Sequence, residues 1–147
     1  MLDTSVLVAA ERGTFAMREF LDQLGAMSVG ISAVTASEFL LGGHRESDPG
    51  AQSQRLARAD SILHDLPLFD FGVIEARRHA ELWARLRRER ALLGPHEMLI
   101  AATALARGHQ LATLNTREFR LVPGLRLVAV DKFVVRVAQE RTDGGVQ

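Results

Sequence analysis

The sequence predicts an α/β fold, with helices packed around a mostly parallel sheet. Short apolar segments typical of strands alternate with longer segments whose apolar residues recur at helical spacing, and this alternation indicates β-α-β units. The 147 residues match one domain in size, and the chain shows neither an internal repeat nor an interdomain linker. We therefore expect one domain over residues 1–130 and a C-terminal extension over 131–147 that ends in a flexible tail.

The first part of the chain predicts a strand, a helix and a second strand. Residues 1–3 form a very short strand candidate that ends at Asp3, beside a turn or helix start. Residues 27–32 alternate in character and end at Ser32, which indicates another short strand. Between them, residues 14–24 predict a helix from apolar side chains at Phe15, Met17, Phe20, Leu21 and Leu24.

Residues 35–43 predict a helix with signals at both ends. Thr35 lies three residues before Glu38, which is the spacing of a capping box, and the pair Gly42-Gly43 is typical of a helix end.

The middle of the chain predicts a loop and two helices. Residues 44–54 are polar and rich in turn formers, which favours a loop. Residues 52–65 and 73–90 are typical of helices, and a short strand or extended link at 66–72 separates them.

The last third continues the alternation. Gly94 and Pro95 are typical of a helix start, and the helix that they open runs to Gly108. We expect a strand at residues 110–115, a turn region at 117–125 and a last strand at 126–130. Residues 131–140 fit either a helix or a strand.

The composition is that of an ordinary globular protein. Hydrophobic residues make up 47% and charged residues 24%, and no apolar run approaches the roughly 20 residues that a membrane helix needs. With 18 basic and 18 acidic residues, the net charge is zero and by itself does not indicate a nucleic-acid partner. The absence of cysteine excludes disulfides and thiolate metal sites, and it fits a cytoplasmic location.

Four polar residues fall where strands end or helices begin. Asp3 and Asn115 follow predicted strands, and Glu38 and Glu97 lie in first turns of predicted helices. In a parallel sheet these positions share one edge, where open α/β sheets place their ligand site. Each also has a structural explanation: Glu38 fits the capping box, Glu97 complements a helix dipole, and Asn115 suits a turn.

A cluster of three acids would require a cation. Two carboxylates about 5 Å apart at an effective dielectric of about 20 repel by roughly 3 kcal/mol, so three together would not stay ionised alone. Oxygen ligands without cysteine suit Mg²⁺ or Mn²⁺ better than zinc. Such an ion orients water and stabilises charge on a phosphate, which indicates phosphodiester hydrolysis.

The chain resembles the PIN-domain ribonucleases, in particular the VapC-type toxins of bacterial toxin–antitoxin pairs. The resemblance covers roughly residues 1 to 130 and rests on four blocks in order. These blocks are "LDTSVLVA", "ISAVTASEFLLG", "LGPHEMLIAATALARG" and "LATLNTREFRLVPGLRLV".

The resemblance implies a three-layer α/β/α domain that cleaves RNA at a divalent-ion site. By the match of the blocks, Asp3, Glu38 and Glu97 hold Mg²⁺, which Mn²⁺ can replace, and Asn115 completes the catalytic site. It also implies a homodimer, and inhibition by a cognate antitoxin whose tail occupies the groove.

Two positions depart from the family pattern. The third acid is usually Asp, and here it is Glu97, which is one methylene longer. The fourth is Asp in some relatives, and here it is Asn115, which brings no charge but accepts through its carbonyl oxygen. Glu118 could supply a charge instead, although an exposed turn residue is the more favoured interpretation. Thr113 matches a family threonine, and the resemblance implies that it contacts the site residues without binding the ion itself.

An arginine-rich segment offers candidates for RNA contact. Arg87, Arg88 and Arg90 lie close before Glu97 in the sequence and could track phosphates beside the groove. The favoured alternative is a solvated helix face with paired charges, such as Glu81 with Arg85. His96 adjoins Glu97, and a loop or helix-capping role is the more common one for such a histidine.

Two functional hypotheses remain at this stage. The first is a Mg²⁺-dependent endoribonuclease that acts as a toxin. The second is a catalytically weakened PIN-fold module, altered at Glu97 and Asn115, that binds RNA or an antitoxin. A P-loop nucleotidase and a serine hydrolase are disfavoured, because the chain has neither a GxxxxGK[ST] loop nor a GxSxG elbow.

Overall fold

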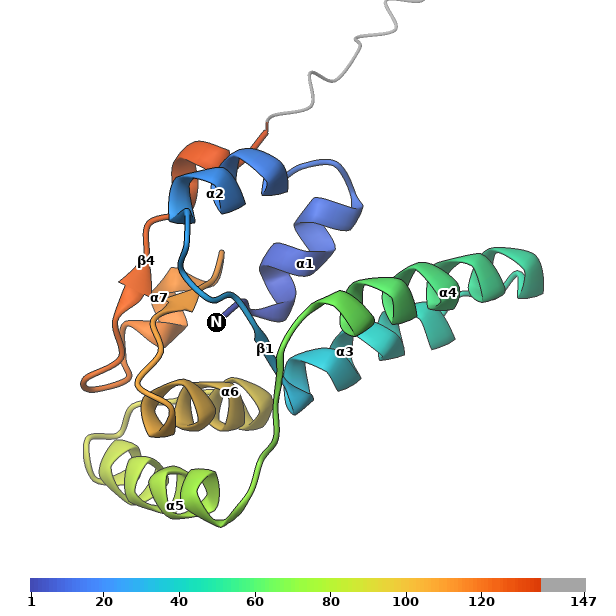
Figure 1. Cartoon of the computed structure of the whole chain (residues 1–147). Helices are drawn as coiled ribbons and strands as arrows, with labels where there is room; N and C mark the ends of the chain where they lie inside the picture. The colour runs from blue at the N-terminus through green and yellow to red at the C-terminus, as the bar shows by residue number, and fades with distance from the viewer. Residues whose placement is uncertain (136–147) are drawn as a thin grey trace, which may run out of the picture.

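The computed structural model describes residues 1–135, which form a small parallel sheet surrounded by helices (Figure 1). Its strands are β1 (Ile31–Ser32), β2 (Leu68–Phe69), β3 (Leu111–Ala112) and β4 (Leu127–Val128). β1 pairs with β2 and β3 pairs with β4, while Leu2 bridges Ile31 on one side and Ala112 on the other. All these pairings are parallel, so the sheet order is β2, β1, Leu2, β3, β4. The predicted α/β fold with a parallel sheet is confirmed.

The helices cover both faces of this sheet. They are α1 (Thr4–Glu11), α2 (Met17–Leu24), α3 (Ala33–His44), α4 (Pro49–Asp65), α5 (Val73–Arg88), α6 (Pro95–Ala106) and α7 (Thr116–Phe119), followed by the 3₁₀ turn η1 (Asp131–Phe133). In Figure 1, α5 and α6 lie together below the strands, and α1 and α2 lie above them. The α3–α4 pair extends to one side.

Two apolar clusters, one on each face, explain the layered arrangement. Leu2, Ile31 and Ala112 contribute to a cluster with side chains of α1, α2 and α3. Met1, which precedes Leu2, and Leu111, which precedes Ala112, contribute to a second cluster with side chains of α5 and α6. Successive residues of an extended segment point to opposite faces, so Met1 and Leu2, like Leu111 and Ala112 of β3, supply both cores.

Helix α3 begins two residues earlier than the sequence predicts, because Ser32 caps it. The Ser32 hydroxyl accepts a 3.0 Å hydrogen bond from the Thr35 backbone nitrogen. Thr35 is fully buried inside the first turn, so the predicted capping box of Thr35 with Glu38 is wrong. The Glu38 side chain is left for another role.

The predicted helix end at Gly42-Gly43 is within one residue of the observed end at His44, but both glycines lie inside the last turn of α3. They allow α4 to approach: a methyl group on Gly43 would lie 2.6 Å from a methyl carbon of Leu56. Close helix packing, not termination, accounts for these residues.

Two loop predictions are corrected as well. Helix α4 starts at Pro49, inside the predicted loop 44–54, because the Asp48 carboxylate accepts from the Ala51 nitrogen at 2.7 Å and Pro49 suits the first turn. The turn region 117–125 overlaps the short helix α7.

The first residues of the predicted C-terminal extension pack on the body. Phe133 is buried, and its ring lies 5.2 Å from that of Phe20 and 6.0 Å from that of Phe15. Val134 forms an antiparallel bridge with Phe15. The expected flexible tail falls in residues 136–147, outside the described residues. Within residues 1–135, no helix is long and apolar enough to cross a membrane.

Candidate active site

The four polar residues singled out in the sequence meet at one edge of the sheet. Asp3 follows the central bridge residue Leu2 and precedes α1, and Asn115 follows β3 and precedes α7. Asp3, Glu38, Glu97 and Asn115 all line one cavity of about 540 Å³ at this carboxyl-terminal edge. The convergence inferred from topology is therefore present in the structure.

Asp3 is held by hydroxyl groups from two directions. Its side chain is buried, and its Oδ2 accepts hydrogen bonds from the Ser5 hydroxyl at 2.6 Å and from the Thr113 hydroxyl at 2.7 Å. Ser5 and Thr113 in turn accept from the backbone nitrogens of Leu114 and Asn115, both at 3.0 Å. Among the described residues, Oδ1 has no hydrogen-bond partner, which leaves this oxygen available to a ligand in the cavity.

Glu38 is held between α1 and α6. One carboxylate oxygen accepts a hydrogen bond from the Thr4 hydroxyl, and the other lies 2.8 Å from His96 Nδ1. His96 is more than half exposed, whereas the Glu38 side chain is 23% exposed. Sequence reasoning noted only that His96 adjoins Glu97, because no spacing could indicate its contact with a residue 58 positions away.

Glu97 lies at the wall between two cavities and turns back along its own helix. A methyl group on Gly94 would lie 2.0 Å from Glu97 Oε2, so the glycine provides the space that this carboxylate occupies. Glu97 also lines a neighbouring cavity of about 670 Å³, and Glu118 lies there with Arg117. Glu118 is thus close to Glu97 but outside the lining of the cavity that contains Asp3.

The described residues contain no set of three His, Asp or Glu side chains already spaced to hold a metal ion. Asp3 and Glu38 are engaged with hydroxyls and an imidazole, and Glu97 is turned over Gly94. The acids share a cavity without forming a closed cage. We expect Glu97 to turn away from Gly94 before it can contact an ion that Asp3 holds.

The basic residues of this cavity are not those that the sequence suggested. Three arginines line it, namely Arg12, Arg45 and Arg55. The predicted candidates Arg87, Arg88 and Arg90 are not in its lining, and Arg88 lines another cavity, beside α5. Arg12, Arg45 and Arg55 are far apart in sequence, so only the packing of α1, α3 and α4 reveals their grouping.

An ion pair between a buried glutamate and a partly exposed arginine, which the sequence did not indicate, lies away from this cavity. Glu75 is 1% exposed, and its carboxylate accepts from the Gly72 nitrogen at 2.9 Å and from Arg107 Nε at 2.6 Å. Backbone hydrogen bonds, more than Arg107 itself, hold the pKa of Glu75 below its usual value. This pair joins α5 to the end of α6 and is part of the scaffold.

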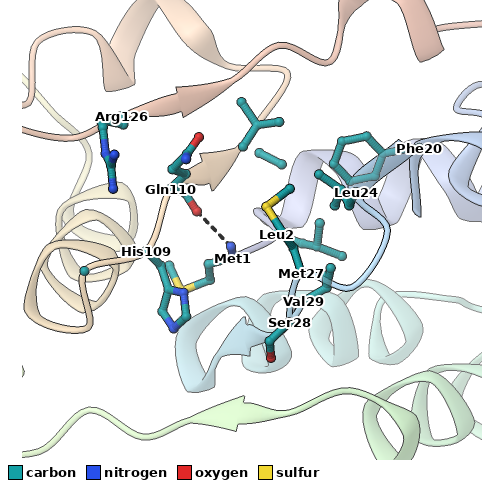
Figure 2. Close-up of a pocket in the computed structure, with 13 residues that line it drawn as sticks. Met1, Leu2, Phe20, Leu24, Met27, Ser28, Val29, His109, Gln110 and Arg126 are labelled. Atoms are coloured by element: carbon teal, nitrogen blue, oxygen red, sulfur yellow. Dashed lines mark hydrogen bonds between the residues drawn. The ribbon is translucent and has the colours of Figure 1, made fainter. Parts of the chain in front are cut away.

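The opposite edge of the sheet carries a mostly apolar pocket of about 310 Å³ (Figure 2). Figure 2 shows Met1, whose nitrogen donates to the Gln110 carbonyl oxygen at 2.8 Å, with His109 beside it. Burial, with a smaller contribution from the N-terminal ammonium and Arg107, lowers the pKa of His109 below its usual value. No residue predicted for the site lines this pocket, which leaves the carboxyl-terminal edge as the candidate active site.

Comparison with known proteins finds similar sequences along most of the chain. A model of the PIN domain matches residues 1–125. A "Ribonuclease VapC" of Rickettsia bellii is 32% identical over 130 residues, which span 88% of this chain and 95% of that protein. A "tRNA(fMet)-specific endonuclease VapC" of Shigella flexneri is 29% identical, over 86% of this chain and 93% of that protein.

Solved structures give the same result for the fold. A chain of the VapBC2 structure from Rickettsia felis, bound to a DNA fragment from the promoter, superimposes with a TM-score of 0.80 at 26% identity. The match covers 87% of this chain and 96% of that one. A chain of the DNA-bound VapBC structure from Salmonella typhimurium gives 0.79 at 27% identity, over 87% and 95% of the two chains.

Proposed function

This chain belongs to the PIN-domain family and resembles its VapC-type members throughout the domain, and we propose that it is an endoribonuclease that acts as the toxin of a toxin–antitoxin pair. The observation that carries the proposal is the convergence of Asp3, Glu38, Glu97 and Asn115 on one cavity. Two relatives with similarity along most of their length are named as RNA-cleaving enzymes, which supports RNA as the substrate.

The chemistry of the cavity fits a hard divalent cation. Its candidate donors are the carboxylates of Asp3, Glu38 and Glu97 and the amide oxygen of Asn115, all oxygen ligands of the kind that Mg²⁺ and Mn²⁺ prefer. A bound Mg²⁺ would stabilise negative charge on the phosphate under attack and orient a water molecule. We propose Asp3 as the anchoring ligand, because its Oδ2 is held by Ser5 and Thr113 while Oδ1 is free to face the cavity.

Glu38 is the proposed general base. His96 and Thr4 orient its carboxylate, and Glu38 lines the cavity in which the attacking water would bind. When water attacks phosphorus, its proton passes to Glu38, the bond from phosphorus to the 3′ oxygen breaks, and the departing 3′ oxygen takes a proton from solvent water. The products are a 5′-phosphate and a 3′-hydroxyl.

A partner protein and a second copy of the chain are also part of the proposal. Similar chains have been solved in VapBC complexes, which supports a cognate antitoxin and a dimeric assembly, and we propose that the antitoxin covers the cavity. We propose the cytoplasm as the site of action, since both the RNA and such an antitoxin would be available there.

Cleavage of total RNA tests this proposal. The purified chain with Mg²⁺ should cleave RNA to 5′-phosphate ends, and chelator, Asp3→Asn or Glu97→Gln should each reduce the rate by at least 100-fold. Glu19→Gln, which removes an exposed acid of α2, is the matched control and should cleave at the normal rate. Absence of cleavage by the folded protein with Mg²⁺ or Mn²⁺ would refute the nuclease.

A second function, a binding module with weakened catalysis, is favoured by one observation. Within residues 1–135, the acids are not spaced to hold an ion, and Glu97 is turned back over Gly94. On this alternative the protein would bind RNA or antitoxin with the same affinity in chelator as in Mg²⁺, and Asp3→Asn would leave that affinity unchanged. The two proposals therefore differ in metal dependence as well as in cleavage.

A further inference from the structure

The cavity that contains the acids has a basic end, formed by the arginines at the ends of two helices. Arg12 follows the last residue of α1, and Arg45 follows the last residue of α3. Both line the same cavity as Asp3 and Glu38. One cavity thus carries negative charge at the start of α1 and positive charge at its end.

Contacts show that α1 and α3 run side by side in the same direction. Near the start of α1, Thr4 contacts Glu38 of α3. At the end of α1, Glu11 contacts Arg55, which also donates to the Gly42 carbonyl oxygen of α3 at 2.7 Å. At 1.5 Å per residue, Arg12 lies about 12 Å beyond Thr4 along the axis, and Arg45 lies about 10 Å beyond Glu38.

Arg55 and Arg12 differ in their pairing, although both lie beside Glu11. Arg55 makes two 3.0 Å hydrogen bonds to the Glu11 carboxylate, so its charge is neutralised and its position is set. Arg12 and Arg45 are exposed and have no acidic partner among the described residues. A cation at a helix C-terminus complements the helix dipole, but that effect does not explain why two helices present unpaired arginines to one cavity.

We propose that Arg12 and Arg45 form a phosphate clamp that holds the backbone of a single-stranded RNA segment on one side of the cleaved bond. This inference rests on the proposed function, because it places the reacting phosphate at Asp3, Glu38 and Glu97. Arginine presents a planar fork of donors that matches phosphate oxygens, and both guanidinium groups are free to do so. A rise of about 10–12 Å along the two helices matches about three nucleotides of one strand.

The clamp predicts a particular salt dependence of RNA binding. Each phosphate contact to a single strand contributes about 0.7 to the slope of log affinity against log salt concentration. The clamp holds the strand equally in the ground state and the transition state, so its loss raises KM and leaves kcat nearly unchanged. Loss of an acid would instead reduce kcat.

The test uses the full-length protein and a fluorescein-labelled 16-nucleotide single-stranded RNA of mixed sequence. Its affinity is measured by anisotropy between 50 and 300 mM salt in chelator, so that cleavage does not interfere. Arg12→Gln and Arg45→Gln should each lower the slope by about 0.7 and weaken binding roughly 3- to 10-fold at the lowest salt. Arg58→Gln removes an exposed arginine of α4 that does not line this cavity, and it should change neither quantity.

The outcomes separate this clamp from the nuclease proposal. Unchanged slopes in both arginine variants would overturn the clamp, even if the protein cleaves RNA in a manner that depends on Asp3. Reduced slopes without any cleavage would keep the clamp and refute the nuclease. If the intact chain does not bind the RNA, the clamp for RNA is overturned. It is also overturned if the chain binds poly-glutamate but not RNA, and the arginine variants reduce the salt slope of poly-glutamate binding. The latter result would assign the arginines to an acidic protein segment.

Discussion

Thr113 donates a 2.7 Å hydrogen bond to Asp3, which lies 110 residues away in the sequence. Both side chains are buried, and the Thr113 hydroxyl also accepts a hydrogen bond from the backbone nitrogen of Asn115. The hydroxyl therefore ties the first proposed acid to the turn that carries the fourth site residue. Asp3 cannot change orientation without breaking this network.

Removal of that hydroxyl should impair the site more than the fold. We expect Thr113→Val to reduce RNA cleavage by about 10- to 100-fold, as is typical when the group that orients a metal ligand is lost. The loss of a hydrogen bond to a charged group should cost about 1.5–3 kcal/mol of unfolding free energy. Thr113→Ser retains the hydroxyl and should retain most of the cleavage rate. Equal rates for the valine and serine variants would show that the bond has no role in activity.

Gly94 should control where the Glu97 carboxylate lies. A methyl group at this position would displace Glu97 Oε2, the end of a flexible side chain, so Gly94→Ala should cost about 1 kcal/mol or less in stability. The displaced carboxylate can then turn toward Asp3, and we expect Mn²⁺ to bind several-fold more tightly in calorimetric titration. Glu97→Gln in the same background should abolish the gain. Unchanged Mn²⁺ affinity in Gly94→Ala would contradict the proposed rotation.

The buried Glu75 should make stability depend on pH in the acid range. Its folded-state pKa lies below the ordinary value of 4.5, so the ionised form stabilises the fold above that value. This contribution is lost as pH falls from 4.5 through the folded-state pKa. In denaturant titrations at pH 7, Glu75→Gln should cost about 1–3 kcal/mol, and its difference from the parent should shrink below pH 4.5. Glu81→Gln, which removes the acid of an exposed pair with Arg78, should show no such trend. A constant difference at all pH values would exclude this role.

The start of the C-terminal extension should be required for stability. Phe133 completes a cluster with Phe15 and Phe20, and Phe133→Ala should reduce the free energy of unfolding by about 3–5 kcal/mol. Val135→Ala changes a side chain that is 45% exposed and should stay within about 0.5 kcal/mol. Thermal unfolding of both variants checks the difference. A small effect of Phe133→Ala would mean that the segment docks without contributing to the core.

The parts of the fold that depend on sequence pattern were predictable. Alternating strand and helix segments predicted the parallel sheet. The positions of four polar residues at strand ends and helix starts predicted that they converge on one cavity, namely Asp3, Glu38, Glu97 and Asn115. The cap of α3 was missed because Thr35 with Glu38 has the same spacing as a capping box, and Ser32 was assigned to the strand. Local signals of equal strength compete there, and tertiary packing decides between them.

The features that depend on distant contacts were not predictable. The contact between His96 and Glu38, and the pairing of Arg55 with Glu11, arise only when separate helices meet. Arginines at the end of α5 looked favourable because they precede Glu97 closely in sequence. They are not in the lining of the cavity that contains Asp3, and Arg88 lines a different cavity beside α5, so their role in RNA contact stays a prediction.

The bridge between Leu2 and Ala112 has a consequence for synthesis of the protein. The central position of the sheet is filled by the second residue, and one of its neighbours is translated near the end of the chain. Such long-range pairing folds slowly compared with local helix contacts. At roughly 5–20 residues per second, the nascent chain spends several seconds on the ribosome with Asp3 made and Thr113 still to come. A growing chain therefore carries no assembled acid cavity beside the ribosomal RNA and tRNA that surround it.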